Sequence, residues 1–202
     1  KQRVAIARMM VTEPELILLD EPFSAIDSYL KWKLEQQLME WLQVTTLLVS
    51  HNRDEIYRLC EGRGVIHCGH MEVCGRKKEI FQNPQTVSAA ILTGCKNIME
   101  ADGNMKKHGI THVGIRSHDI RMQKADEKYV VKTEENDENF RMSAVVERKI
   151  EAPFDAIYVV RPKEKGNESV RVEIPKSTGE KFEEGQKVVL EIPKEKLLRL
   201  RG

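Results

Sequence analysis

The sequence ELILLDEPFSAID at residues 15–27 contains a short apolar run that two acidic residues and a proline end. Residues 16–19 read Leu-Ile-Leu-Leu, and Asp20 and Glu21 follow directly. An uninterrupted apolar run of this length is typical of a central parallel strand, because both faces of such a strand are buried. We therefore expect a strand at residues 15–19 that helices cover on both faces.

Asp20 and Glu21 are predicted at the carboxyl end of that strand. A buried charge is costly unless a cation or a hydrogen-bond donor faces it, so two carboxylates at this point indicate a ligand rather than a stabilising role. Open α/β sheets bind their ligands at the carboxyl ends of parallel strands. The pair therefore predicts a site for a magnesium-bound nucleotide.

The segments on either side of this strand predict further α/β structure. Residues 1–11 alternate charges with small apolar residues, which favours a helix that ends before Pro14. Ser28 can cap a second helix. The apolar positions of that helix recur at helical intervals: Leu30, Leu34, Leu38, Trp41 and Leu42.

A second strand is predicted at residues 44–49, which are mostly β-branched or apolar. A right-handed crossover through the intervening helix makes the two strands parallel. Ser50 and His51 are then expected at the same edge of the sheet as Asp20 and Glu21.

Three motifs together resemble the ATP-binding cassette (ABC) ATPases. LILLDEP followed by SAID is similar to the Walker B strand and D-loop of that family. KQRVAIAR at residues 1–8 is similar to the helix after its signature loop, and LLVSHNRDE at 47–55 to its switch-histidine loop. The motifs stand in the family's order. The resemblance covers residues 1–95 and implies part of a P-loop NTPase nucleotide-binding domain.

This resemblance implies a role for each polar residue of the motifs. Asp20 would hold Mg²⁺, Glu21 would polarise the attacking water, and His51 would contact the γ-phosphate. The other positions implied to contact ATP or its dimer partner are Ser24, Asp27, Gln2 and Arg3. By position alone, the D-loop acid can equally be a helix cap, and the two residues past the signature a solvated helix end.

Two motifs of the family are absent from the sequence. No GxxxxGK[ST] phosphate-binding loop occurs, and the signature LSGG would stand directly before Lys1. We therefore expect the chain to be the C-terminal part of an ABC ATPase that does not hydrolyse ATP by itself.

The segment after the switch-histidine motif predicts a capped helix and a hairpin. Asn52 with Glu55 three residues later indicates the helix start, and Gly62 its end. The hairpin is expected at residues 64–74, before short helices at about 77–82 and 86–94. Its side chains His67, Cys68, His70 and Cys74 raise the alternative of a zinc site. On a hairpin, however, such side chains alternate between faces, and four irregularly spaced cysteines favour a reduced, cytoplasmic setting.

From Cys95 onward the pattern changes to short alternating strands. They are expected at 113–115, 129–131, 142–146, 157–159, 170–174 and 188–192, with a loop at 124–139. The stretches GCKNI, GIRSHDI and IPKEKLLRL resemble the OB-like accessory (TOBE) domain of ABC importer ATPases. We therefore predict an α/β domain at residues 1–95 followed by an all-β OB-like barrel at residues 96–202.

Composition excludes several classes of function. The chain has 33 Lys and Arg against 32 Asp and Glu, and neither part carries the basic excess that nucleic-acid binding needs. Aromatic residues make up only 5%, which disfavours an OB-type oligonucleotide binder. No apolar run approaches a membrane span, and no signal peptide opens the sequence. A soluble protein is expected.

The resemblance implies the ATP-hydrolysing subunit of an ABC importer, with ATP and Mg²⁺ as cofactors. Its partners would be membrane permease subunits and a second copy of the ATPase, at the inner face of the cell membrane. GIRSHDI is most similar to molybdate or sulfate importer ATPases, whereas iron, polyamine and sugar importers share both domains. The alternative is a non-catalytic regulatory or dimerisation module whose β-domain binds a small oxyanion, with Arg116, Lys149 and Arg161 as candidate ligands.

Overall fold

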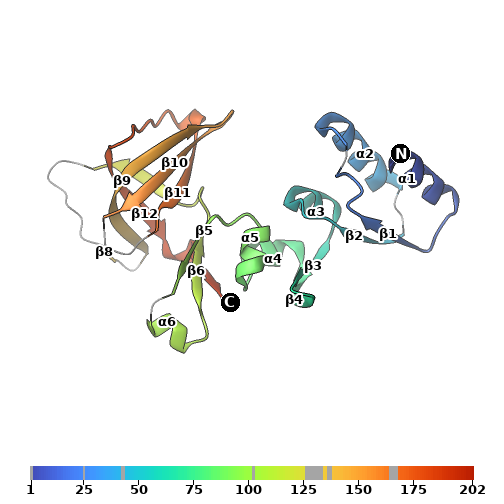
Figure 1. The fold of residues 1–202 in the computed structure, drawn as a ribbon, viewed down its shortest axis with the longest axis horizontal. Helices are drawn as coiled ribbons and strands as arrows, with labels where there is room; N and C mark the ends of the chain where they lie inside the picture. The colour runs from blue at the N-terminus through green and yellow to red at the C-terminus, as the bar shows by residue number, and fades with distance from the viewer. Residues whose placement is uncertain are drawn as a thin grey trace. The chain divides into compact units, whose positions relative to one another are not determined.

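The computed structural model describes residues 2–24, 26–41, 44–101, 103–125, 134–135, 138–163 and 168–202. Helices and parallel strands come first and a strand-rich part follows, as predicted (Figure 1). Contacts divide the chain into unit 1, residues 1–64 and 74–79, and unit 2, residues 65–73 and 80–202. This division differs from the domain boundary predicted between residues 95 and 96. That boundary stays a prediction. No helix among the described residues is both long and apolar enough to cross a membrane.

Unit 1 is built on two parallel strands and three helices. In chain order these are α1 (Gln2–Val11), β1 (Leu16–Asp20), α2 (Ser28–Trp41), β2 (Thr45–Val49) and α3 (Arg53–Leu59). The strands pair from Leu16 opposite Thr45 to Asp20 opposite Val49. The predicted strand–helix–strand order is confirmed, and the carboxyl ends of β1 and β2 meet at one edge.

One face of the β1–β2 pair is covered and the other is exposed. Ile17 is buried, and Leu19 packs on a core to which α1 and α2 contribute. That core consists of Ile6, Phe23, Leu34 and Leu38. On the opposite face, Leu16, Leu18, Leu47 and Val49 are each exposed by 53 to 67%. The expectation of helices on both faces is therefore wrong for the described residues.

Side-chain caps fix the starts of α2 and α3. The Asp27 carboxylate accepts a hydrogen bond from the Leu30 backbone N–H at 3.1 Å, so Asp27 caps α2, the alternative role considered for the D-loop acid. The expectation that Ser28 is the cap is wrong, because Ser28 is the first residue of the helix. The Asn52 side chain accepts bonds from two backbone N–H groups in the first turn of α3, as predicted. Each cap sits directly after a loop that leaves the sheet edge.

The predicted hairpin is present, slightly longer than expected. Strands β3 (Gly62–His67) and β4 (His70–Arg76) join through Cys68 and Gly69, whose φ values of 47° and 78° are both left-handed. Two left-handed residues make the tight turn that matches strand twist. Helices α4 (Lys77–Gln82) and α5 (Val87–Leu92) follow. Val65, Val73, Ile80 and Ala89 form the local core.

Unit 2 also contains a small three-stranded antiparallel sheet in the order β13-β6-β5. The elements are β5 (Asn97–Glu100), α6 (Gly103–Lys107), β6 (His112–Ile115) and β13 (Leu198–Leu200). Leu198 and Leu200 bury their side chains with Ala90 and Cys95. Of these elements the sequence predicted only β6, because the others are short and carry no clear alternation.

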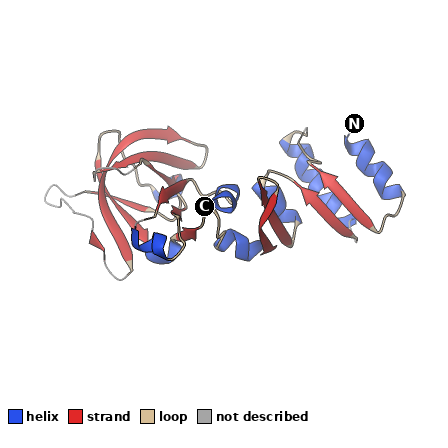
Figure 2. Ribbon diagram, turned by 60° about the horizontal axis from the view of Figure 1, so that its bottom comes forward, coloured by secondary structure: helices blue, strands red, loops and turns tan. Residues whose placement is uncertain are grey.

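The larger sheet of unit 2 is antiparallel and curled (Figure 2). Its strand order is β11-β10-β9-β12-β7, and β8 (Glu134–Glu135) pairs with β9. Its strands are β7 (Arg121–Lys124), β9 (Asn139–Glu151), β10 (Asp155–Pro162), β11 (Val170–Pro175) and β12 (Lys187–Pro193). Two short 3₁₀ turns lie at Lys176–Thr178 and Lys194–Lys196. Tyr158 and Phe182 meet edge to face inside the curl, with ring centres 5.5 Å apart. The strand predicted at 129–131 lies outside the described residues.

Candidate functional site

The edge formed by the carboxyl ends of β1 and β2 brings Glu21 and His51 into direct contact. Glu21 continues the parallel ladder, because its N–H donates to the Val49 carbonyl at 2.9 Å. One carboxylate oxygen of Glu21, Oε1, accepts the His51 backbone N–H at 2.9 Å and lies 2.6 Å from His51 Nδ1. Two residues that are 30 positions apart in the sequence therefore share one hydrogen-bonded centre.

The electrostatics of this contact favour an ionised carboxylate. The side-chain hydrogen bond from His51 is the main cause that holds the pKa of Glu21 below its ordinary value, against a smaller opposing effect of burial. An ionised carboxylate only accepts, so Nδ1 donates, and Nε2 has no partner among the described residues. Glu21 is thus a negatively charged acceptor beside an imidazole that keeps one ring nitrogen available.

The backbone at Glu21 is also unusual. Its φ of 44° lies in the left-handed region, which a non-glycine residue occupies at a cost of order 1 kcal/mol. The turn is held by Ser24, whose N–H and Oγ both donate to the Glu21 carbonyl, at 3.3 and 3.0 Å. Ser24 therefore fixes the conformation that directs Glu21 toward His51.

Asp20 lies one residue before Glu21, at the end of β1. Its carboxylate is exposed and has no hydrogen-bond or ion-pair partner among the described residues. A single available carboxylate fits a ligand of Mg²⁺, which in nucleotide sites is held by one or two carboxylates together with phosphate oxygens and water. Within the described ranges, no three His, Cys, Asp or Glu side chains group to form a metal site of their own.

A second set of polar residues, of which the sequence placed only Ser50 at this edge, supports the His51 turn. Ser50 Oγ donates to the Glu55 carboxylate at 2.5 Å and accepts the Asn52 N–H at 3.0 Å. Glu55 is 3% exposed and also pairs with Lys31 of α2. The helix that starts at the Asp27 cap is thereby tied to the turn that carries His51. The sequence signal was the spacing of Asn52 and Glu55, which indicated only a helix start.

The buried Glu35 on α2 makes a second ion pair with α3, to the half-exposed Arg58. Its carboxylate is 1% exposed and accepts two hydrogen bonds from the Arg58 guanidinium, at 2.9 and 3.0 Å. Such a two-bond pair fixes the distance between the two helices. The helices on either side of the candidate site are therefore linked twice.

The remaining predicted residues are not brought to this centre by any described contact. Gln2 and Arg3 begin α1, and their side chains lie outside the described ones. In unit 2, Arg116 donates to the backbone carbonyls of Phe81 and Thr93. Two further basic side chains are occupied by carboxylates: Lys149 by Glu151 and Glu183, and Arg161 by Glu147. The three basic residues suggested as oxyanion ligands are thus already bound by groups of the protein itself.

No model of a known protein family matches the chain. Curated relatives, however, are import ATP-binding proteins. The spermidine/putrescine import ATP-binding protein PotA of Bacillus thuringiensis subsp. konkukian is 34% identical over 131 residues, covering 63% of this chain and 38% of PotA. The molybdate/tungstate import ATP-binding protein WtpC of Pyrococcus abyssi is 37% identical over 137 residues, covering 59% and 40%. PotA of Mycoplasmopsis synoviae is 38% identical over 104 residues, covering 50% and 23%.

The relatives confirm the predicted resemblance: the homologues of this chain are ABC importer ATPases. The chain spans about two fifths of the length of PotA from Bacillus and of WtpC. Among solved structures, the molybdate-bound form of the cytoplasmic molybdate-binding protein ModG overlaps 43% of this chain and 58% of its own. That overlap has 9% identity and a TM-score of 0.32, too low to support a conclusion about fold or ligand.

Proposed function

We propose that this chain is the part of an importer's ATP-hydrolysing subunit that supplies the water-activating carboxylate and the switch histidine. The observation that carries the proposal is the contact of Glu21 with His51 at the edge of the parallel sheet. The import ATP-binding relatives support it. The alternative of a purely regulatory module has no comparable observation in its favour.

In the proposed reaction, Glu21 orients and deprotonates the attacking water. Its Oε1 is engaged by His51, whereas Oε2 has no partner among the described residues and can accept a proton from water. His51 keeps the carboxylate in place through its backbone N–H and its Nδ1–H. In the imidazolium form, in which both ring nitrogens carry hydrogen, Nε2 can also donate to the terminal phosphate of ATP. Glu21 thus acts on the water, and His51 acts on the carboxylate and the phosphoryl group.

Asp20 would hold the Mg²⁺ that accompanies ATP. When bound, this ion offsets the negative charge of the phosphates. The phosphate-binding loop of such a site is not in this sequence. The chain therefore contributes one half of the proposed site, and a segment with backbone N–H groups and a lysine must contribute the other half.

The exposed face of β1 and β2 supports a missing partner segment. Contiguous apolar surface on a soluble domain typically marks an interface. The exposed residues lie on one face of the parallel pair whose carboxyl ends carry the candidate site: Leu16, Leu18, Leu47 and Val49. We infer that the phosphate-binding part of the same ATPase domain packs on this face.

For the cargo we propose an oxyanion such as molybdate or sulfate, which the similarity to WtpC supports. The similarity to PotA, a spermidine/putrescine import protein, makes polyamines the competing class of transported solute. Because permease and binding subunits choose the solute, the test must be made in the source organism. Deleting the gene there should reduce uptake of labelled molybdate or sulfate. A loss of labelled spermidine uptake alone would reassign the cargo.

The catalytic role is tested in a protein that joins this chain to the phosphate-binding part of the ATPase. Glu21→Gln should reduce ATP turnover by at least about 100-fold, the usual contribution of a general base, while ATP affinity changes by only a few-fold. Glu15→Gln is the matched control, since Glu15 is an exposed acid just before β1. It should leave turnover unchanged.

Two results would contradict the proposal. One is a Glu21→Gln variant that mainly loses ATP binding, because the carboxylate would then act in binding and not in the chemical step. The other is ATP turnover by the 202-residue chain alone that Glu21→Gln abolishes. The second result would mean that another segment of this chain binds the phosphates.

A further inference from the structure

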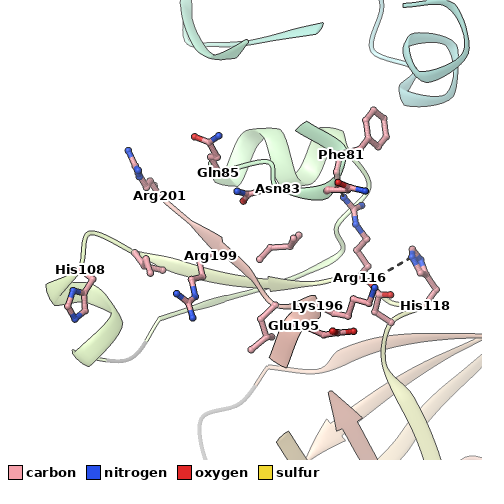
Figure 3. A pocket seen from close by; sticks show the side chains of 15 residues that line it. Phe81, Asn83, Gln85, His108, Arg116, His118, Glu195, Lys196, Arg199 and Arg201 are labelled. Atoms are coloured by element: carbon pink, nitrogen blue, oxygen red, sulfur yellow. Dashed lines mark hydrogen bonds and ion pairs between the residues drawn. The ribbon is translucent and has the colours of Figure 1, made fainter. Parts of the chain in front are cut away.

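Unit 2 contains an open hollow of about 930 Å³ that the ATPase proposal does not use. Figure 3 shows the side chains that line it. They come from the segment around Phe81 to Gln85, from the segment after α6, from the turn after β6, and from β13 and the 3₁₀ turn before it. The lining is mostly polar, and six of its residues are basic or histidine: Arg116, Lys196, Arg199, Arg201, His108 and His118. Its size is within the range of small-molecule sites, which is roughly 300–1,000 Å³.

Two arginines of this lining, Arg199 and Arg201, are carried by one short stretch of backbone at β13. Leu198 and Leu200 of β13 are buried in the core, whereas Arg199 and Arg201 are exposed, and their side chains leave the backbone in different directions (Figure 3). The Arg201 N–H donates to the Gln85 carbonyl at 2.9 Å, and the Arg201 carbonyl accepts the Val87 N–H at 3.1 Å. The backbone that carries both guanidinium groups is therefore held at the edge of the hollow before any ligand arrives.

The charge of these side chains is not neutralised within the described residues. Lys196, Arg199 and Arg201 make no ion pair or hydrogen bond there through their side chains. Asp119 and Glu195 are the two acids of the lining, and Asp119 lies 3.9 Å from His118. Arg116 adds a fourth permanent charge in the wall, where two backbone carbonyls anchor it. The hollow therefore has an excess of positive charge, and three of its basic side chains can still bind an anion.

We propose that this hollow binds a small organic anion with two or more phosphate or carboxylate groups. Arg199 and Arg201 are two residues apart on a strand, so their Cα atoms are about 7 Å apart. Because the two side chains also point apart (Figure 3), they can reach two anionic groups of one molecule better than a single compact oxyanion. Arginine binds phosphate and carboxylate with paired hydrogen bonds, which gives such a ligand both charge and direction. All of its lining residues belong to unit 2, and the proposal does not depend on ATP hydrolysis.

The test is a calorimetric titration of the whole chain with fructose 1,6-bisphosphate and, separately, with citrate. Fructose serves as the uncharged control, and molybdate serves as the compact oxyanion for comparison. We expect a dianionic or trianionic probe to bind, and the Arg Nε–H signals of Arg199 and Arg201 to shift in ¹H–¹⁵N spectra. The arm that binds more tightly identifies phosphate or carboxylate as the preferred group.

The variant Arg199→Ala/Arg201→Ala should weaken this binding at least tenfold. The charge-matched control is Arg121→Ala/Arg148→Ala, because both arginines are exposed on β7 and β9 and do not line the hollow. The control should bind as the unchanged chain does. Equal weakening by both pairs would overturn the proposal in favour of diffuse charge attraction.

Three other outcomes would also overturn it. The first is the absence of heat with either polyanion at millimolar concentration. The second is binding of molybdate alone, which would indicate a compact-oxyanion site. The third is binding of an oligoglutamate peptide at the same two arginines without binding of either small polyanion. That result would make the hollow a docking surface for an acidic polypeptide.

Discussion

The parallel pair of unit 1 and the curled sheet of unit 2 bury their apolar residues to very different extents. In β1, an unbroken apolar run leaves Leu16 and Leu18 exposed while Ile17 is buried. In β12, Val188 and Leu190 are both fully buried, because the sheet curls around its own core. A curled antiparallel sheet can cover its apolar face by itself, whereas a two-stranded parallel pair needs further layers on both faces.

This difference indicates where each region obtains its stability. Unit 2 has the larger core cluster, which includes Tyr158, Val160 and Val172 with no exposed surface. Among its described residues, unit 1 has a smaller core, which lies on one side of its strands. Substitutions on the two sides of a strand should therefore have very different effects in unit 1, and the largest single effect should fall in unit 2.

The largest expected effect is that of Tyr158→Ala in unit 2. Tyr158 is fully buried against Phe182, and its hydroxyl accepts the Phe182 N–H at 3.4 Å. Removing the ring should cost about 3–5 kcal/mol, as for large aromatic truncations in cores. Urea unfolding followed by far-UV circular dichroism measures the loss. Trp32 and Trp41 are both in unit 1, so the urea midpoint of the unfolding that their fluorescence reports should change little. A parallel shift of both signals would contradict independent cores.

An intermediate effect is expected from a pair of substitutions in β1. Ile17→Ala should cost about 2–4 kcal/mol, because Ile17 is 3% exposed on the covered face. Leu18→Ala, one residue further on, should change stability by less than about 0.5 kcal/mol, because Leu18 is 67% exposed. Tryptophan fluorescence in urea, at low protein concentration, measures both. If Leu18→Ala costs as much as Ile17→Ala, the face is covered in solution by another copy of the chain.

The smallest expected effect concerns the Glu21–His51 contact. The hydrogen bond from His51 lowers the pKa of Glu21, so the stability from this contact is present above the ordinary pKa of 4.5. It is lost as the pH falls through the lower folded pKa. A carbon-13 titration of the Glu21 carboxyl should show the lowered pKa, and His51→Ala should raise it toward the ordinary value.

Glu72 is the internal control for that titration. Hydrogen bonds from Thr86 and Ser88 lower the pKa of its carboxyl, and His51 is not among the causes. The Glu72 titration should therefore be unchanged in His51→Ala. If the Glu21 titration is also unchanged, the contact with His51 does not exist in solution.

Local sequence signals were sufficient for much of unit 1 and for the long strands of unit 2. The run at Leu16–Leu19, the Asn52 cap and the β-branched alternation at Val170–Ile174 all appear in the structure where they were expected. The short strands β5 and β13 were missed, because three or four residues carry too little pattern. The pairing of β13 with β6 also depends on residues about 85 positions apart.

The sequence by itself determined the strand that ends in Asp20 and Glu21, the parallel partner that ends before His51, and the resemblance to ABC ATPases. These depend on apolar periodicity and on motif spacing, which are local. Only the tertiary structure showed that Glu21 Oε1 meets both donors of His51 and that the buried Glu55 ties the His51 turn to Lys31. It alone placed Arg199 and Arg201 at one hollow. Such contacts join residues far apart in the chain, and their geometry follows from packing and backbone turns, which no short stretch of sequence records.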